Sequence, residues 1–120
     1  MNRRTFIILL TFLSTTLLSF AQPKREVRAV WLTTIGGLDW PHSYSQHSQS
    51  MEKQKQELTN ILDKLQKAGI NTVLLQTRVR GTMIYPSEYE PWDGCLSGCP
   101  GKSPGYDALE FAINECHKRG

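Results

Sequence analysis

The hydrophobic pattern divides most of the chain into alternating strand and helix segments. Residues 26–34 are rich in apolar and β-branched residues and predict a strand. Apolar residues then recur at spacings of three, four and seven, which predicts one buried helix face made of Met51, Leu58, Ile61, Leu62, Leu65 and Ala68. We expect Ser50 to cap this helix and Gly69 to end it. Residues 72–78 predict a second strand, whose apolar run at 73–75 suits burial on both faces.

A second helix follows a long loop at residues 79–105. Asp107 is its predicted N-cap, and Glu110 three positions later fits a capping-box pattern. A strand–helix–strand crossover of this kind implies a parallel pair with right-handed connection. Two parallel strands form a poor sheet alone, and a short helix-to-strand turn after Gly120 would start a third strand. We therefore expect an α/β fold and a chain that is the front part of a longer protein.

The two loops that follow the strands are long, whereas the turn from the first helix to the second strand is minimal. In parallel α/β folds the carboxyl ends of the strands carry the functional site, so long loops there favour function. These loops hold most of the large aromatic residues, namely Trp40, Tyr44, Tyr85, Tyr89 and Trp92. Aromatic faces suit the C–H faces of sugar rings, and Tyr85 and Trp92 are therefore candidate substrate contacts. The alternative is a small core beneath the loops.

Three polar residues after the strands are further candidates. Side chains two apart on a strand share one side, so Gln76 and Arg78 are expected to point the same way. Arg78 could hold a substrate hydroxyl or orient a carboxylate, or it could form a structural ion pair. Asp39 could contact a ligand or shape a turn.

Other reactive residue types give weaker signals. Glu88, Glu90 and Asp93 lie close together, but carboxylates in one loop are more often solvated or capping groups than a catalytic pair. The two loop histidines have no third ligand at a metal-binding spacing, and no glycine-rich phosphate loop is present, so we predict no metal and no cofactor. Cys95 and Cys99 could form a small disulfide loop.

Residues 1–21 have the three parts of a secretory signal peptide. Arg3 and Arg4 precede an apolar run at 6–20, and Ser19 and Ala21 stand at the small-residue positions before a cleavage site. The run is short for a membrane span and contains several hydroxyl residues. We expect an exported mature chain, periplasmic or extracellular, that begins at residue 22.

Charge argues against nucleic acid as a partner. The chain has 14 Lys and Arg against 11 Asp and Glu, a formal charge of +3, and the leader supplies two of the arginines. No basic stripe remains of the kind that follows a phosphate backbone.

A set of short motifs in a fixed order resembles the bacterial glycosyl-hydrolase-like family 10. The motifs are Arg28-Ala29-Val30-Trp31, Asp39-Trp40-Pro41, Gln76 to Arg78, Tyr85-Pro86-Ser87, Pro91-Trp92, Gly98 to Gly101, Pro104 to Asp107 and His117 to Gly120. The resemblance covers residues 25–120. It implies an exported bacterial protein with a (β/α)8 TIM-type barrel that cleaves glycan strands, including peptidoglycan without stem peptides. This chain would supply the first two strand–helix units, an incomplete barrel.

The resemblance also implies site residues. Asp39, Trp40, Gln76 and Arg78 match as candidate substrate-site residues at the barrel mouth. Thr77 and Val79 depart from the Val-Arg-Pro that commonly follows the glutamine, so the rim of that loop is expected to differ. The catalytic carboxylates are expected on later strands, and no catalytic residue is assigned.

Three interpretations of function remain open at this stage. The first is part of an exported glycoside hydrolase acting on glycan or polysaccharide, with this stretch inactive alone. The second is a non-catalytic glycan-binding or cell-envelope protein on the same fold, because fold does not settle activity. The third is a truncated gene product without function. Asp or Glu at the ends of two later strands would favour the enzyme.

Overall fold

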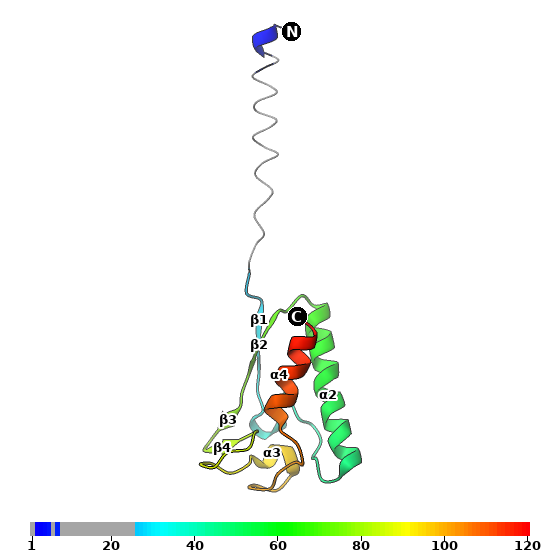
Figure 1. The fold of residues 1–120 in the computed structure, drawn as a ribbon, viewed down its shortest axis with the longest axis vertical. Coiled ribbons are helices and arrows are strands. Elements are labelled where there is room, and N and C mark those ends of the chain that lie inside the picture. Colours follow the sequence, from blue (N-terminus) through cyan, green and yellow to red (C-terminus); the bar gives the residue numbers. More distant parts are fainter. Residues whose placement is uncertain (1, 6, 8–25) are drawn as a thin grey trace.

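A computed structural model of the chain describes residues 2–5, 7 and 26–120 (Figure 1). The predicted signal peptide at residues 1–21 lies largely outside the described residues and stays a prediction. From residue 26 onward the structure is a mixed α/β arrangement, as predicted. Among the described residues, no helix is both long and apolar enough to cross a membrane.

Two short parallel strands form the centre of the fold. β1 (Ala29–Leu32) pairs in parallel with β2 (Thr72–Leu75), in a register that runs from Ala29 opposite Thr72 to Leu32 opposite Leu75. The connection between them is α2 (Ser48–Lys67), the helix that the apolar spacing predicts. The predicted parallel pair is therefore confirmed.

α2 and α4 (Ala108–Lys118) lie together on one side of the strand pair (Figure 1). They bury an apolar core against the strands, because each helix presents one apolar stripe. The buried members of this core are Leu32, Trp40, Leu58, Leu62, Ile84, Cys95, Leu96, Ala108 and Ala112.

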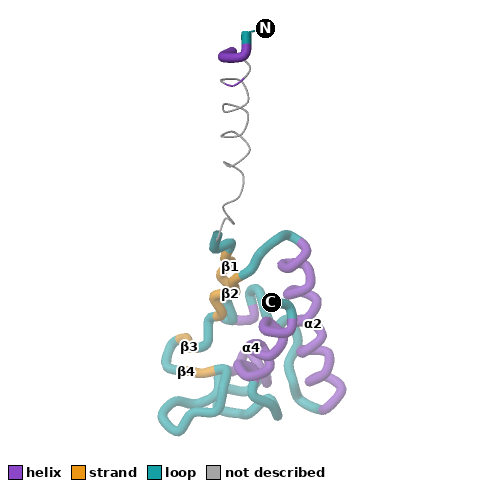
Figure 2. The backbone as a smooth tube through the Cα atoms, turned by 45° about the horizontal axis from the view of Figure 1, so that its top comes forward, coloured by secondary structure: helices purple, strands orange, loops and turns teal. Residues whose placement is uncertain are grey.

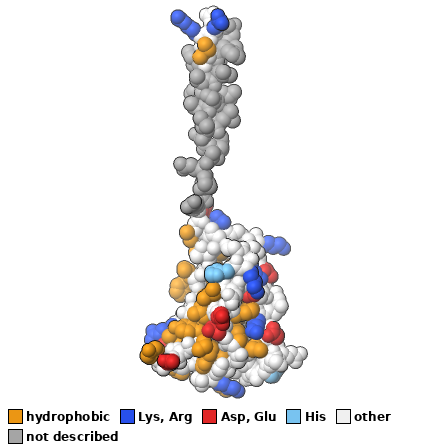
Figure 3. Space-filling view, in the orientation of Figure 1, with side chains coloured by type: hydrophobic (Ala, Val, Ile, Leu, Met, Phe, Trp, Pro, Cys, Tyr) orange, Lys and Arg blue, Asp and Glu red, His pale blue; other side chains and the backbone are white. Residues whose placement is uncertain are grey.

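The other face of the strand pair is uncovered in the described part of the chain. Trp31 is 61% exposed and its register partner Leu74 is 50% exposed. Both helices pack on the same face, so within the described residues only one face of β2 is covered, and the predicted cover on its second face stays a prediction. A groove of about 290 Å³ also runs between β2 and α4 and is lined mainly by apolar side chains such as Val73, Leu109 and Ile113. In the view of Figure 3, exposed hydrophobic side chains gather over the lower half of the molecule.

The helix ends follow local capping chemistry. α2 begins one turn earlier than expected, because His47 rather than Ser50 is the N-cap: the Ser50 backbone N–H donates to His47 Nδ1, and the Ser50 hydroxyl accepts from the His47 backbone N–H. Gly69 follows the helix with φ +84°, a left-handed conformation that glycine adopts without steric cost. Asp107 caps α4 as predicted, its carboxylate accepting from the Glu110 backbone N–H at 2.9 Å.

The two long loops contain short ordered elements. The first holds the 3₁₀ turn η2 (Ile35–Gly37), and the second holds an antiparallel hairpin of β3 (Arg78–Val79) and β4 (Thr82–Met83) followed by the short helix α3 (Gly94–Ser97). The prediction of an irregular loop at 79–105 was thus incomplete. These elements gather at one end of the molecule, beyond the carboxyl ends of β1 and β2 (Figure 2).

Candidate functional site

Gln76 joins the ends of the two parallel strands. Its side-chain Oε1 accepts three hydrogen bonds, from the Thr33 hydroxyl at 2.5 Å and from the backbone N–H groups of Thr34 and Ile35, each at 3.1 Å. The Thr34 hydroxyl in turn donates to the Gln76 carbonyl at 3.0 Å. The loop after β1 is therefore held at the end of β2 by hydrogen bonds to the side chain and the backbone carbonyl of Gln76.

Asp39 forms a hydrogen bond within the same loop. The Thr33 backbone N–H donates to Asp39 Oδ2 at 2.8 Å, so Thr33 bonds Asp39 through its backbone and Gln76 through its hydroxyl. This contact confirms a loop-shaping role for Asp39. Its Oδ1 has no hydrogen-bond partner among the described residues, and the side chain is only partly buried. The predicted ligand contact stays open, and the structure brings Asp39 and Gln76 to one edge.

Arg78 does not continue the strand that precedes Gln76. β2 ends at Leu75, and Arg78 begins β3, so the expected shared side of Gln76 and Arg78 on one strand is wrong. Arg78 forms an ion pair with Glu90 instead. Its guanidinium Nε donates to Glu90 Oε2 at 2.7 Å, and its Nη2 donates to Glu90 Oε1 at 2.5 Å. The hydrogen bond and the charge of Glu90 raise the pKa of Arg78, and the hydrogen bond from Arg78 lowers the pKa of Glu90. Most of the guanidinium side chain is exposed, so this is a surface ion pair.

Trp40 is a core residue in this structure. Its side chain is fully buried, and the indole N–H donates to the Gln54 carbonyl in α2 at 3.0 Å. The predicted substrate contact by Trp40 is therefore wrong here, because no part of the ring is accessible. An indole packs its large apolar surface in the interior when its single donor finds a partner.

The remaining loop aromatics divide into packed and exposed rings. Tyr85 and Trp92 are half-buried, and Trp92 packs against the core. Tyr44 is 57% exposed and Tyr89 is 92% exposed. The accessible rings at this end are thus Tyr44 and Tyr89, and Tyr85 and Trp92 keep part of their surface available as predicted contacts.

A cavity of about 530 Å³ opens between the two loops. Its lining combines backbone and polar groups, including Gly36, Gly37, His42, Tyr44, Arg80 and Asp93. Arg80 holds φ +51°, a conformation that asparagine and glycine adopt more readily in a tight hairpin turn. An open, mixed polar and aromatic cavity at the carboxyl end of the strands is suited to a hydroxyl-rich ligand.

The loop carboxylates Asp93 and Glu90 have structural roles. Asp93 is the N-cap of α3, accepting from the Cys95 backbone N–H at 2.7 Å and from the Thr82 hydroxyl. Burial raises the pKa of Asp93, but the hydrogen bonds from Thr82 and Cys95 outweigh burial and the pKa is lowered overall. Since Glu90 is bound by Arg78, these groups fit the predicted solvated or capping role.

The cysteines are free thiols. Cys95 is buried in α3 and Cys99 is exposed, so the predicted Cys95–Cys99 disulfide is not formed. Cys95 points into the core that α3 covers, and burial raises the pKa of its thiol. In the described part of the chain, no group of three or more His, Cys, Asp or Glu residues is placed to hold a metal ion.

Gln54 is the polar residue that sequence analysis missed. It is fully buried: its Nε2 donates to the carbonyls of Ser43 and Leu96, and its Oε1 accepts from the Tyr106 hydroxyl. Position 54 lies three after Met51 and four before Leu58, inside the predicted apolar stripe. A polar residue at such a position is the signal that could have found it.

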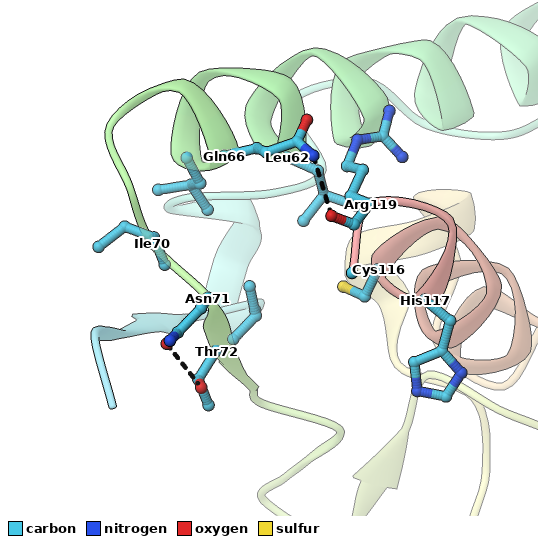
Figure 4. A pocket seen from close by; sticks show the side chains of 11 residues that line it. Leu62, Gln66, Ile70, Asn71, Thr72, Cys116, His117 and Arg119 are labelled. Carbon is cyan, nitrogen blue, oxygen red and sulfur yellow. Dashed lines mark hydrogen bonds between the residues drawn. The ribbon is translucent and has the colours of Figure 1, made fainter. Parts of the chain in front are cut away.

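Another pocket lies at the other end of the strands. It occupies about 240 Å³ between the end of α2, the start of β2 and the end of α4 (Figure 4). Gln66 donates to the Arg119 carbonyl across one side of it, and Leu62, Ile70 and Cys116 make its lining partly apolar. Because it lies away from the long loops, it is separate from the Asp39–Gln76 edge.

Comparison with known proteins places the sequence beside glycosyl hydrolases. A family described as Glycosyl hydrolase-like 10 matches residues 26–120. The chain is 44% identical over 115 residues to "Glycosyl hydrolase YngK" of Bacillus subtilis (strain 168), which covers 96% of this chain and 21% of that protein. It is 40% identical over 103 residues to "Glycosyl hydrolase DigH" of Escherichia coli (strain K12), covering 82% of this chain and 24% of that protein. The chain thus spans about a fifth to a quarter of the length of these relatives.

Proposed function

The chain belongs to the glycosyl hydrolase-like 10 family, and we propose that it is the first part of an exported glycoside hydrolase that cleaves glycan chains. In this proposal the two strand–helix units are the beginning of a (β/α)8 barrel. The substrate we propose is the glycan strand of peptidoglycan.

The observation that carries the proposal is the polar edge formed by Asp39 and Gln76 at the carboxyl ends of two parallel strands. In barrels of this kind the loops at that end build the active site. The cavity between the two loops and the exposed Tyr44 ring, at the same end of the molecule, add the mixed polar and aromatic surface that sugars require. In this proposal, the chain supplies one wall of the cleft.

The catalytic acid and its carboxylate partner are proposed to lie on other strands of the longer protein. Glycoside hydrolysis needs two carboxyl groups that flank the scissile bond. Glu90 and Asp93 are held by Arg78 and by the α3 cap, which leaves them poorly suited to proton transfer. Two strand-end Asp or Glu residues are therefore expected in the sequence beyond this chain.

Location is part of the proposal. The leader pattern at residues 1–21 supports export, and peptidoglycan lies outside the cytoplasmic membrane. N-terminal sequencing of the protein from the exported fraction should begin at residue 22. A mature protein that keeps Met1 would contradict export by cleavage.

The test of activity uses the full-length protein that contains this chain. We expect new reducing ends when it is incubated with purified peptidoglycan strands from which the stem peptides have been removed, measured by a reducing-sugar assay and mass spectrometry of the products. Cellulose and starch serve as comparison substrates from other glycan classes in the same assay. Binding of the strands without cleavage would overturn the hydrolase and favour a glycan-binding protein.

A further inference from the structure

We propose that Gln76 and Asp39 form a subsite of fixed hydrogen-bond polarity, in which Gln76 Nε2 donates to a sugar oxygen and Asp39 Oδ1 accepts from a neighbouring sugar hydroxyl. The ligand of this subsite is an uncharged sugar face. The inference rests on the proposed function and deepens it, because it says which chemical groups of the glycan are read at this edge.

The hydrogen bonds around Gln76 determine which way its amide points. Two of the three donors to the amide oxygen are backbone N–H groups, at Thr34 and Ile35, and a backbone N–H can only donate. If the amide were turned over, its NH₂ group would face both of them. The oxygen is therefore held inward, and Nε2 is the outward group.

The outward amide is available to a ligand. Among the described residues none accepts a hydrogen bond from Gln76 Nε2, and no buried side-chain nitrogen or oxygen lacks a partner. Nε2 is thus not enclosed by the described residues. A group that can only donate requires an oxygen that accepts, such as a hydroxyl, a ring or an acetamido carbonyl oxygen.

Asp39 supplies the opposite polarity close by. Its Oδ2 is held by the Thr33 backbone N–H at 2.8 Å, and the hydroxyl of the same Thr33 donates to Gln76 at 2.5 Å. Oδ1 is left as an acceptor without a partner in the described part of the chain. Thr33 therefore links Gln76, whose outward group donates, to Asp39, whose second oxygen accepts, at a single edge of the strand pair.

The charge at this edge selects against an anionic group. Asp39 brings a carboxylate, and the guanidinium of Arg78 is already bound by both oxygens of Glu90. A sugar carboxylate placed beside Asp39 would meet like charge, which disfavours it there. The subsite is therefore one for hydroxyl or acetamido groups.

The test exchanges donor for acceptor while keeping the inward bonds. In the full-length protein, Gln76→Glu keeps an inward oxygen for Thr33, Thr34 and Ile35 but presents an oxygen outward. We expect the KM for soluble peptide-free glycan strands to rise about tenfold or more, with kcat changed far less. Because the new carboxylate lies at the same edge as Asp39, a modest fall in melting temperature is expected as well. Asp39→Asn keeps an oxygen for the Thr33 N–H and replaces the outward acceptor with an amide NH₂ donor. This variant should raise KM in the same way.

The control is Gln56→Glu, the same chemical change on the exposed surface of α2, which should leave KM unaltered. An active wild-type enzyme with unchanged KM in both Gln76→Glu and Asp39→Asn would overturn the subsite. If the wild type binds the strands without cleaving them, the Kd replaces KM in the same comparison. A wild type that neither binds nor cleaves them would overturn the proposed function and the subsite with it.

Discussion

The helix-covered layer and the loop end of the molecule are held together by different interactions. The layer formed by β1, β2, α2 and α4 is stabilised by apolar burial, with Leu58 and Leu62 almost completely enclosed. The loop end also buries apolar side chains, namely Trp40, Ile84 and Leu96. It is organised in addition by side chains that bond to backbone groups, such as Gln76 to Thr34 and Asp93 to Cys95.

The difference shows how a small sheet can support a polar site. Apolar burial is non-directional and tolerates exchange of similar side chains, whereas a hydrogen bond fixes atoms in a given direction. The hydrogen bonds of the loop end therefore fix the positions of its polar groups, whereas apolar burial in both regions supplies stabilising free energy. Four substitutions test this division, beginning with the largest expected effect.

Leu62→Ala should destabilise the protein most. Truncating a fully buried leucine removes apolar contacts and leaves a cavity, for a loss of about 2–5 kcal/mol in the free energy of unfolding. Leu38→Ala is the matched control, because Leu38 is 71% exposed, and it should cost less than about 0.5 kcal/mol. Urea denaturation measures both, and equal losses would contradict the proposed source of stability.

Gln54→Ala should break the connection between the two regions. It would leave the carbonyls of Ser43 and Leu96 and the Tyr106 hydroxyl without their partner. We expect a loss of about 1–3 kcal/mol in the free energy of unfolding, because buried polar groups without partners are costly. Gln56→Ala on the exposed side of α2 provides the comparison, and a similar loss there would argue against this role.

Asp93→Asn should alter the acid stability of the loop end. The pKa of Asp93 is lowered in the folded protein, so its stabilising effect is complete above the unfolded pKa and is lost as the pH falls through the folded value. Below about pH 4, the melting temperature of the wild type should therefore fall more steeply than that of the variant. Parallel slopes for the two proteins would show that the Asp93 charge does not stabilise the loop.

Arg78→Gln should have the smallest effect on stability. The ion pair with Glu90 is exposed to solvent, and exposed pairs are weakened by water and salt. We expect a melting temperature close to that of the wild type at physiological salt. A marked decrease, measured by differential scanning calorimetry, would mean that the pair holds the hairpin in place.

The regular elements were predictable because their signals are local. The spacing of Leu58, Leu62 and Leu65 predicts α2, and Asp107 predicts the start of α4. The N-cap of α2 was misplaced because Ser50 and His47 exchange hydrogen bonds, and serine is the commoner N-cap.

The site was predictable only in part, because its geometry depends on contacts distant in the sequence. Asp39 and Gln76 were candidates from their positions in the sequence. Both bond Thr33, however, and Thr33 lies 43 positions before Gln76. The aromatic pattern could not separate the buried Trp40 from the exposed Tyr44, because both lie in the same loop. Arg78 was assigned to β2 because the sequence does not mark the end of that strand at Leu75.

The exposed position of Trp31 on the uncovered face of β1 gives the protein an optical reporter. An indole that is 61% exposed emits at longer wavelength and is quenched readily by dissolved iodide, whereas Trp40, at 0% exposure, is shielded from it. Any segment or molecule that covers this face would shift the Trp31 emission to shorter wavelength and protect it from the quencher. Occupation of the open face can therefore be followed in solution by intrinsic fluorescence, without a label.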